Sequence, residues 1–393
     1  MTHVERIEDA AAFEKLRGEW TALLSTCTSD CLFLTWEWLF TWWKHLAEDR
    51  RLSILVVRSR GELIAIAPLA WRPRRLSHLL SVRSLEFLGT GSVGSDYLDL
   101  ITRRGLAVEA ARALAAHLVD GTAVMGLAQL EPGAPNAWRL AAELERRGWS
   151  VRSAGTSVCP FIDLAGGSWE SYLDGLGPAH RYNFRRRLRQ LSRLGELRLE
   201  RVETEAQRRA AVRALVTLHH MRWYPRGGSS ALHSTSLVAF HDEFSGLALE
   251  RGWLRLFTLR LDGRPVASVY GFRYRDRFYF YQSGFDPSYA RQSSGLVALG
   301  LSIKAAVEEG VKEYDLLHGD EEYKFHWAHR TRALQRLELY PPRVRGWLYR
   351  QAIEASRAAR HVARRVLLET VSPGFAAGRR NEPYAVDHAT GAP

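Results

Sequence analysis

A chain of 393 residues is long for one hydrophobic core and predicts two domains of ordinary size. Its 46% hydrophobic and 25% charged residues are typical of a soluble globular protein, and no apolar run of about 18 residues predicts a membrane span. The charged N-terminal residues lack the apolar segment of a signal peptide, and the three cysteines lack CxxC spacing. We therefore expect a reduced, cytoplasmic protein without a metal site, whose net charge of +12 favours anionic ligands.

The first half of the chain alternates helical and strand patterns. Helices are predicted at about 9–24 and 35–47, the second with Thr35 as N-cap. Strands are predicted at 52–59, 62–72, 85–89, 96–101 and 123–130, helices at about 105–119 and 136–147, and two closing strands at "SVRSAG" and "SVCPFID". This order predicts a mixed sheet with helices on its faces, which is an α/β class of fold.

The second half repeats that order. Helices at about 169–195 and 205–222 lead through an irregular stretch to strands at 254–261 and 265–274, joined by a tight turn at Asp262-Gly263. A strand at 277–285, a helix at about 294–309 and strands at 313–318 and 333–340 follow. The repetition predicts two tandem domains at 1–165 and 166–342. A basic amphipathic helix at 343–370 and a disordered tail at 371–393 complete the prediction.

A short Gly/Ser-rich turn stands between the strand at 277–285 and the next helix. It contains Arg291, Gln292, Ser293, Ser294 and Gly295. The first turn of a helix offers free backbone N–H groups and the positive end of the helix dipole, which together bind anions. Two interpretations remain open from these residues: an ordinary capped turn, or a site for the phosphates of a ligand.

The stretch "RQSSGLV" resembles the pyrophosphate-binding motif Q/R-x-x-G-x-G/A of GNAT acyltransferases. Gln292 and Gly295 match this motif, and Val297 replaces its final small residue. The later stretch "YDLLHGDEEYKFHW" resembles the signature of CelD-like acetyltransferases, which are tandem-GNAT proteins related to the FemAB peptidyltransferases. Its matching residues are Asp315, Gly319, Asp320, Glu321, Tyr323, Lys324 and Trp327. Together with "GSDYLDL", "HRYNFRRRLRQL" and "HHMRWYPRGG", the resemblance covers about 35–340.

Acyl transfer from a thioester needs a base for the acceptor, an acid for the leaving thiolate and a donor for the oxyanion. The strand at 313–318 is expected beside and parallel to that at 277–285, with ligands beyond their carboxyl ends. We expect Asp320 as the base or substrate orienter, with His318 as second candidate, and Tyr323 or Tyr281 as the acid. The predicted substrate-binding residues are Lys324, Glu321, Gln282, Asp96 and Tyr97.

Each of these assignments has a structural alternative. The turn at 318–324 could be a solvated acidic turn in which Lys324 pairs with Glu321. The pair Asp96 and Tyr97 could belong to a half-buried strand edge. The stretch 181–195 carries six arginines, at 181, 185, 186, 187, 189 and 193, and could follow phosphates of coenzyme A, tRNA or a membrane, or could be a solvated basic helix.

The resemblance implies two tandem GNAT-like acyl-CoA N-acyltransferase domains plus a C-terminal basic helix. It also implies transfer of an acetyl or longer acyl group from acyl-CoA to an amine or hydroxyl of a sugar or small metabolite in envelope, exopolysaccharide or secondary-metabolite synthesis. Because the first half of the sequence has no Gly-rich phosphate turn, we expect only the second domain to bind the acyl donor. The alternatives are FemAB-like aminoacyl transfer from tRNA, and a non-catalytic scaffold in a polysaccharide-producing complex. The basic helix at 343–370 could also contact a membrane peripherally.

Overall fold

The computed structural model describes residues 1–75, 81–119, 124–224, 232, 234–342, 346, 350 and 351. The predicted helix at 343–370, apart from three positions, and the predicted tail at 371–393 lie outside these residues. The described chain packs into two compact units. Unit 1 comprises Met1–Trp43, Ala47–Thr156 and the chain from Leu334, and unit 2 comprises Lys44–Leu46 and Ser157–Ala333. No described helix has the length and apolar character needed to cross a membrane.

Unit 1 contains two sets of strands, and its helices α2 and α4 pack on the first of them. Its helices are α1 (Ala10–Lys15), α2 (Arg17–Ser25), most of α3 (Trp36–Leu46), α4 (Ala107–Leu118) and α5 (Pro135–Glu145). Its strands are β1 (Thr2–Ile7), β2 (Arg51–Leu52), β3 (Ile54–Ser59), β4 (Glu62–Ala67), β5 (Leu69–Arg75), β6 (Ser81–Phe87), β7 (Ile101–Thr102), β8 (Val124–Leu130), and parts of β9 (Ser150–Asp163) and β15 (Arg330–Tyr340). Strands β1-β3-β4-β7 form one sheet, and β15-β8-β6-β5-β2 follow one another in the other.

The strand predictions for unit 1 need several corrections. The single strand expected at 62–72 is two strands, β4 and β5, which belong to different sheets. The strand expected at 96–101 is only the two-residue β7, because Tyr97 has a φ of +59° that interrupts the extended backbone. The two expected closing strands are one continuous strand, β9. The polar segment Thr2–Ile7 forms β1 by pairing with β3, although its sequence shows no strand pattern.

Unit 2 is built on a single twisted set of strands. Its helices are α6 (Trp169–Gly175), α7 (Pro178–Ser192), α8 (Glu205–Trp223), α9 (Thr235–Glu250), α10 (Ser294–Glu308) and α11 (Glu322–Phe325). Its own strands are β10 (Leu197–Arg201), β11 (Leu254–Leu261), β12 (Arg264–Tyr274), β13 (Arg277–Phe285) and β14 (Glu313–Asp315), and a 3-10 turn, η3 (Pro287–Gln292), precedes α10. The strand order is β10-β11-β12-β13-β14-β9, and only β13 and β14 run parallel in this set.

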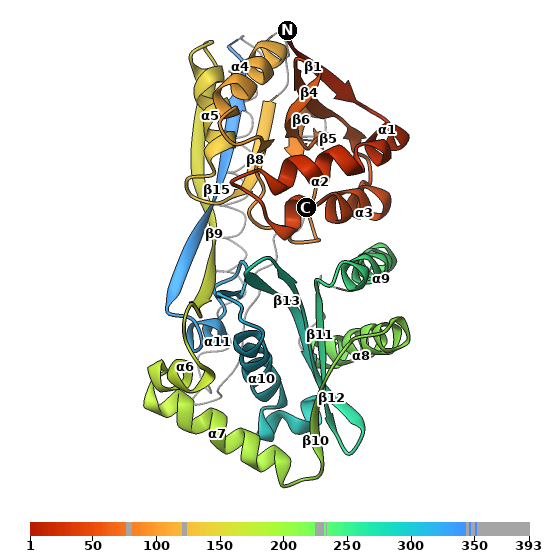
Figure 1. Ribbon diagram of the computed structural model, residues 1–393, viewed down its shortest axis with the longest axis vertical. Coiled ribbons are helices and arrows are strands. Elements are labelled where there is room, and N and C mark those ends of the chain that lie inside the picture. Colours follow the sequence, from red (N-terminus) through yellow and green to blue (C-terminus); the bar gives the residue numbers. More distant parts are fainter. Residues whose placement is uncertain are drawn as a thin grey trace, which may run out of the picture. The chain divides into compact units, whose positions relative to one another are not determined.

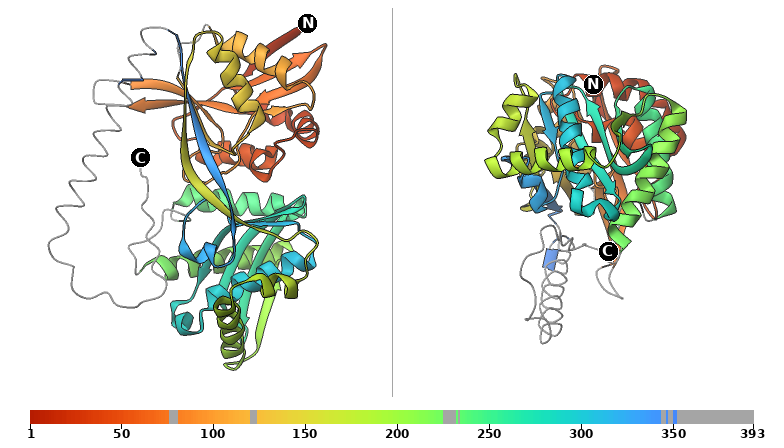
Figure 2. Two further views of the ribbon diagram at one scale, coloured as in Figure 1. Left: turned by 90° about the vertical axis from the view of Figure 1, so that its left-hand side faces the viewer. Right: turned by 90° about the horizontal axis from the view of Figure 1, so that it is seen from below.

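Helices cover both faces of this sheet (Figure 1, Figure 2). Helices α8 and α9 lie on one face, and α10, with α6 and α7 beside it, lies on the other. Alternate residues of a strand point to opposite faces, so Phe257 and Leu259 of β11 join the core under α10. In α10 a Cβ on Gly300 would overlap Phe184 and lie 2.8 Å from Trp327, so this glycine allows α7 to pack closely on α10.

The sequence predictions for unit 2 are confirmed in their order and wrong in four details. The turn Asp262-Gly263 joins β11 and β12 with φ values of 47° and 74°, the left-handed conformations that a tight hairpin requires. The helix predicted over 169–195 is two helices, because Gly177 and Pro178 end one and begin the next. Helix α9 and strand β10 were not expected, and the strand predicted at 313–318 ends at Asp315.

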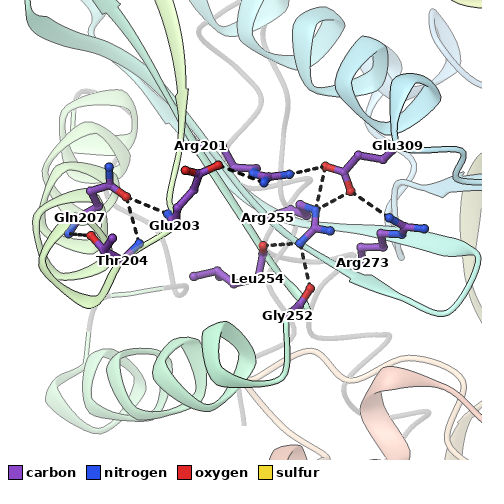
Figure 3. Close-up of polar contacts among 9 residues, drawn as sticks. All are labelled: Arg201, Glu203, Thr204, Gln207, Gly252, Leu254, Arg255, Arg273 and Glu309. Atoms are coloured by element: carbon purple, nitrogen blue, oxygen red, sulfur yellow. Dashed lines mark hydrogen bonds and ion pairs between the residues drawn. The ribbon is translucent and has the colours of Figure 1, made fainter.

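The C-terminal end of α10 is tied to three strands through one carboxylate (Figure 3). Glu309 accepts from Arg255 Nε at 2.7 and 2.9 Å, from Arg201 Nη1 at 3.1 Å and from Arg273 Nη1 at 3.4 Å. These arginines come from β10, β11 and β12. Cations near a helix C-terminus also complement its dipole. The network therefore fixes the direction of α10, whose other end is the predicted phosphate turn.

Candidate active site

Two parallel strands of unit 2 separate at the centre of the candidate site. β14 pairs with only the first residues of β13, from Arg277 opposite Glu313 to Tyr279 opposite Asp315. β13 continues to Phe285, whereas the segment after β14 turns away from it through Leu317, which has a φ of +56°. The predicted parallel neighbours are therefore confirmed. Because β14 ends at Asp315, one edge of β13 beyond Tyr279 has no pairing with β14, and ligands of parallel strands bind beyond such carboxyl ends.

A β-bulge reshapes β13 at this edge. Tyr270 of β12 pairs with Gln282 and Gly271 pairs with Phe280, so Tyr281 is the extra residue. The half-buried Tyr281 ring lies 5.0 Å from the ring of His241 and 5.7 Å from that of Tyr270. The bulge thus lies at two predicted site residues, Tyr281 and Gln282, which are consecutive in β13.

Helix α8 packs against the end of β13. His219 Nδ1 lies 3.2 Å from the carbonyl oxygen of Ser283, and Arg222 Nη1 donates to Ser283 Oγ at 3.1 Å. The approach is close because Gly284 has no side chain: a Cβ there would overlap the backbone at His219. Arg222 lies in the stretch "HHMRWYPRGG", which is part of the family resemblance, but the sequence alone does not predict its contact with β13.

The turn at 317–324, which follows β14, is held by a buried cation. Lys324 Nζ donates to the carbonyl oxygen of His318 at 2.7 Å and lies 2.8 Å from Glu321 Oε2. Burial opposes this charge, but Tyr323 and Glu321 outweigh it and keep the pKa of Lys324 above its usual value. Gly319 has a φ of +126° and no room for a Cβ against Glu321. The predicted pairing is thus present, and it is buried rather than solvated.

The Tyr323 side chain, on the turn at 317–324, packs against the core of unit 2. Burial raises the pKa of its phenol, and the positive charges of Lys324 and Arg222 act against that rise. The phenol therefore keeps its proton at neutral pH. The neighbouring His318 and Asp320 are exposed on the same turn.

The predicted phosphate turn has the geometry of an uncapped helix N-terminus. Ser293 has a φ of +54° and makes no side-chain cap, and α10 begins at Ser294. The first-turn N–H groups of a helix have no acceptor within the helix and so can bind an anion. Gly295 packs on the ring of Phe285, since a Cβ would lie 2.9 Å from that ring. Ser294 Oγ donates to the Val266 carbonyl oxygen at 3.3 Å.

The other residues of this turn differ in exposure. Val297, which departs from the family motif, is buried in the core of unit 2. Arg291 is exposed, and Gln292 is half-buried with its Oε1 atom buried. Arg187 Nη1 of α7 donates to the carbonyl oxygen of Arg291. The arginine-rich helix α7 and the phosphate turn, which were predicted separately, are therefore neighbours.

Two predicted substrate residues lie in unit 1. Asp96 is fully buried and accepts from Gln129 Nε2 at 2.9 Å, and Tyr97 is also buried. Their roles toward a substrate stay predictions. Among the described residues, no group of three or more His, Cys, Asp and Glu side chains has an arrangement that could hold a metal ion.

Comparison with known proteins agrees with this geometry. Residues 178–325, from the start of α7 to the end of α11, match the family model of the acetyltransferase (GNAT) domain. The crystal structure of FemX is similar over 88% of this chain and 99% of its own, with a TM-score of 0.58 and 11% identity. The C-terminal domain of a putative lysylphosphatidylglycerol synthetase from Agrobacterium fabrum is similar over 84% of this chain and 92% of its own, with a TM-score of 0.51 and 12% identity. No curated protein matches the sequence.

The fold and the family match define a GNAT acyltransferase domain in unit 2, built on mixed α/β sheets. The protein is an acyltransferase enzyme. The predicted resemblance to GNAT acyltransferases is thereby confirmed, and the narrower resemblance to CelD-like proteins stays a prediction.

Proposed function

We propose that unit 2 transfers an acetyl or longer acyl group from acyl-CoA to an amine, or a hydroxyl, of a sugar or other small metabolite. The observation that carries this proposal is the uncapped first turn of α10, which follows β13 through the short turn η3, with Gly295 against Phe285. Free N–H groups and the positive dipole end at this turn suit a pyrophosphate. The GNAT match over 178–325 contains the whole turn and supports acyl-CoA as the donor.

The thioester would lie along β13, beyond the last residue that pairs with β14. Backbone N–H groups of an unpaired strand edge can donate to an extended ligand, and one of them can stabilise the oxyanion that forms on the thioester carbonyl. The bulge at Tyr281 and the turn at 317–324 border this edge. Lys324 and Glu321 position that turn.

The reaction would be direct. The acceptor nitrogen attacks the thioester carbonyl carbon, a C–N bond forms, and the C–S bond breaks. Asp320 takes the proton that the amine loses, and Tyr323 or Tyr281 gives a proton to the leaving thiolate. Tyr323 is protonated at neutral pH, as the acid role requires, although burial raises its pKa and so makes its proton harder to release. We propose cytoplasmic synthesis of envelope components, exopolysaccharides or secondary metabolites as the setting.

Donor binding tests the first part. Thermal unfolding of the full chain is measured with acetyl-CoA, longer acyl-CoA thioesters and S-acetylpantetheine, which lacks the phosphates. Acyl-CoA should raise Tm, and S-acetylpantetheine at the same concentration should raise it much less. No stabilisation by any acyl-CoA, together with loss of the aminoacyl ester from charged tRNA when acceptor is present, would favour aminoacyl transfer instead. Neither activity would favour a scaffold.

Catalysis tests the second part. Release of free thiol from acetyl-CoA is measured with a panel of amino sugars and small amines. Asp320→Asn should lower turnover by about a hundredfold or more and leave the acetyl-CoA stabilisation unchanged. Glu322→Gln is the matched control, because Glu322 is also an exposed carboxylate of this turn. Equal turnover in both variants would remove Asp320 from the base role.

A further inference from the structure

One side of α7 carries a row of cationic side chains. Tyr182, Arg185, Arg186, Arg189 and Arg193 follow the spacing i, i+3, i+4, i+7 and i+11, which places them on one side of the helix and its C-cap. The row covers about 17 Å along the axis. We call these five residues the arginine face. Its members are exposed, apart from the half-buried Arg186.

The opposite side of α7 is fixed to unit 2. Phe184 and Leu191 are buried in the core, and Leu188 packs against it. The missing side chain of Gly300 lets Phe184 approach α10. An amphipathic helix binds a bilayer by inserting its apolar side, and in α7 that side is already occupied by the protein. The arginine face is therefore suited to a ligand that is recognised by charge and not to an acyl-chain environment.

The charge of this face is not neutralised by the described chain. The stretch 178–195 contains no Asp or Glu. Among the described residues, no carboxylate lies within ion-pair distance of Arg185, Arg186, Arg189 or Arg193 (Arg186 instead contacts Asn183 Oδ1 at 3.1 Å). On α8 of the same unit, Arg208 and Arg209 both pair with Glu205. An unneutralised row of arginines attracts a polyanion.

An exposed aromatic ring stands within this row. Tyr182 is 60% exposed, and Arg186 Cζ lies 5.8 Å from the centre of the tyrosine ring. Arginines that follow a phosphate backbone, combined with an aromatic ring on which a base stacks, are the features that bind single-stranded nucleic acids. A small inorganic anion would pair with the arginines but could not stack on the Tyr182 ring.

We propose that the arginine face binds a single-stranded nucleic acid, with its phosphates along the four arginines and one base stacked on Tyr182. Arg187 connects this face to the phosphate turn, because it donates to the carbonyl oxygen of Arg291. The inference goes beyond the proposed acyl transfer and does not depend on it. Nucleic-acid binding is measured without an acyl donor, so the two proposals can fail separately.

Fluorescence anisotropy of a short labelled oligouridylate and of an oligothymidylate, at several NaCl concentrations, tests the proposal. Four phosphate contacts on a single strand predict that log K falls with log salt with a slope of about −3. The double variant Arg185→Gln/Arg189→Gln should reduce the slope to about −1.5. Tyr182→Ala should weaken binding about tenfold without changing the slope, and Tyr182→Phe should bind like the wild type.

The matched control is Arg209→Gln/Arg213→Gln, which removes two exposed arginines one turn apart on α8 and has the same change in net charge. This control should keep the wild-type salt slope. Equal loss of binding in the two double variants would overturn the proposal, since net charge alone would then explain it. Vesicles of anionic phosphatidylglycerol that compete with the oligonucleotide and remain bound by Tyr182→Ala as by the wild type would also overturn it.

Discussion

Lys324 Nζ lies 2.8 Å from Glu321 Oε2, and these side chains are only 5% and 10% exposed. Breaking a buried pair leaves one charge without compensation, at a cost of about 3 to 5 kcal/mol. Lys324→Met should therefore lower the free energy of unfolding by about 3 kcal/mol in urea denaturation. The double variant Lys324→Met/Glu321→Gln should recover part of that loss.

The exposed pair Lys304–Glu308, at 3.6 Å, provides the control for this prediction. Exposed pairs contribute about 0 to 1 kcal/mol, so Lys304→Met should change stability little. If Lys324→Met were no more destabilising than Lys304→Met, the buried pair would not be what holds the turn at 317–324.

Two glycines inside helices of unit 2 should respond oppositely to the same substitution. Gly300→Ala places a methyl group against Phe184 and Trp327 and should destabilise by about 1 to 3 kcal/mol. Gly246→Ala, where a Cβ would have its nearest neighbour at 3.8 Å, should stabilise by about 0.5 to 1 kcal/mol. Chemical denaturation of both variants measures the difference. A Gly300→Ala variant at least as stable as the wild type would mean that α7 does not pack on α10 as described.

Glu309 should contribute more to stability than its neighbour in the chain. Glu309→Gln leaves Arg201, Arg255 and Arg273 without their shared carboxylate and should cost about 1 to 2 kcal/mol. Glu308→Gln removes the same charge from an exposed side chain and should cost less than about 0.5 kcal/mol. Thermal unfolding of the two variants at low and high salt makes the comparison. Equal values would reduce the network to surface ion pairs.

His241 should make the fold sensitive to acid. Burial lowers its pKa to about 3, whereas a histidine in the unfolded chain titrates at about 6.5. The unfolded state then binds more protons between these values, so this residue's contribution to stability is present at neutral pH and is lost as the pH falls. Between about pH 7 and pH 4 the loss is about 3 kcal/mol.

His241→Gln removes this titration and should flatten the dependence of unfolding free energy on pH over that range. Denaturation of the wild type and the variant at both pH values gives the difference directly. A wild type and variant that lose the same free energy on acidification would show that His241 is not buried in its neutral form.

Local features of the chain predicted much of the fold and part of the site. The hairpin at Asp262-Gly263 follows from two residues that adopt left-handed conformations, and the start of α10 follows from Ser and Gly before an apolar periodic run. The parallel placement of β13 and β14 follows from the helix between them. These signals depend on neighbours in sequence, so they can be read without coordinates.

Other features depend on residues far apart in the chain. Helix α9 packs on both β11 and α8, so its apolar residues do not form one clear stripe in the sequence. Its helical structure therefore depends on these tertiary contacts. The same holds for the site. The sequence determined the residue types in the turn at 317–324 and in the phosphate turn. Only the tertiary structure decided that Lys324 is buried, that Arg222 acts on Tyr323, and that Arg187 contacts the turn at Arg291, because burial and charge–charge distances are set by how the helices pack on the sheet.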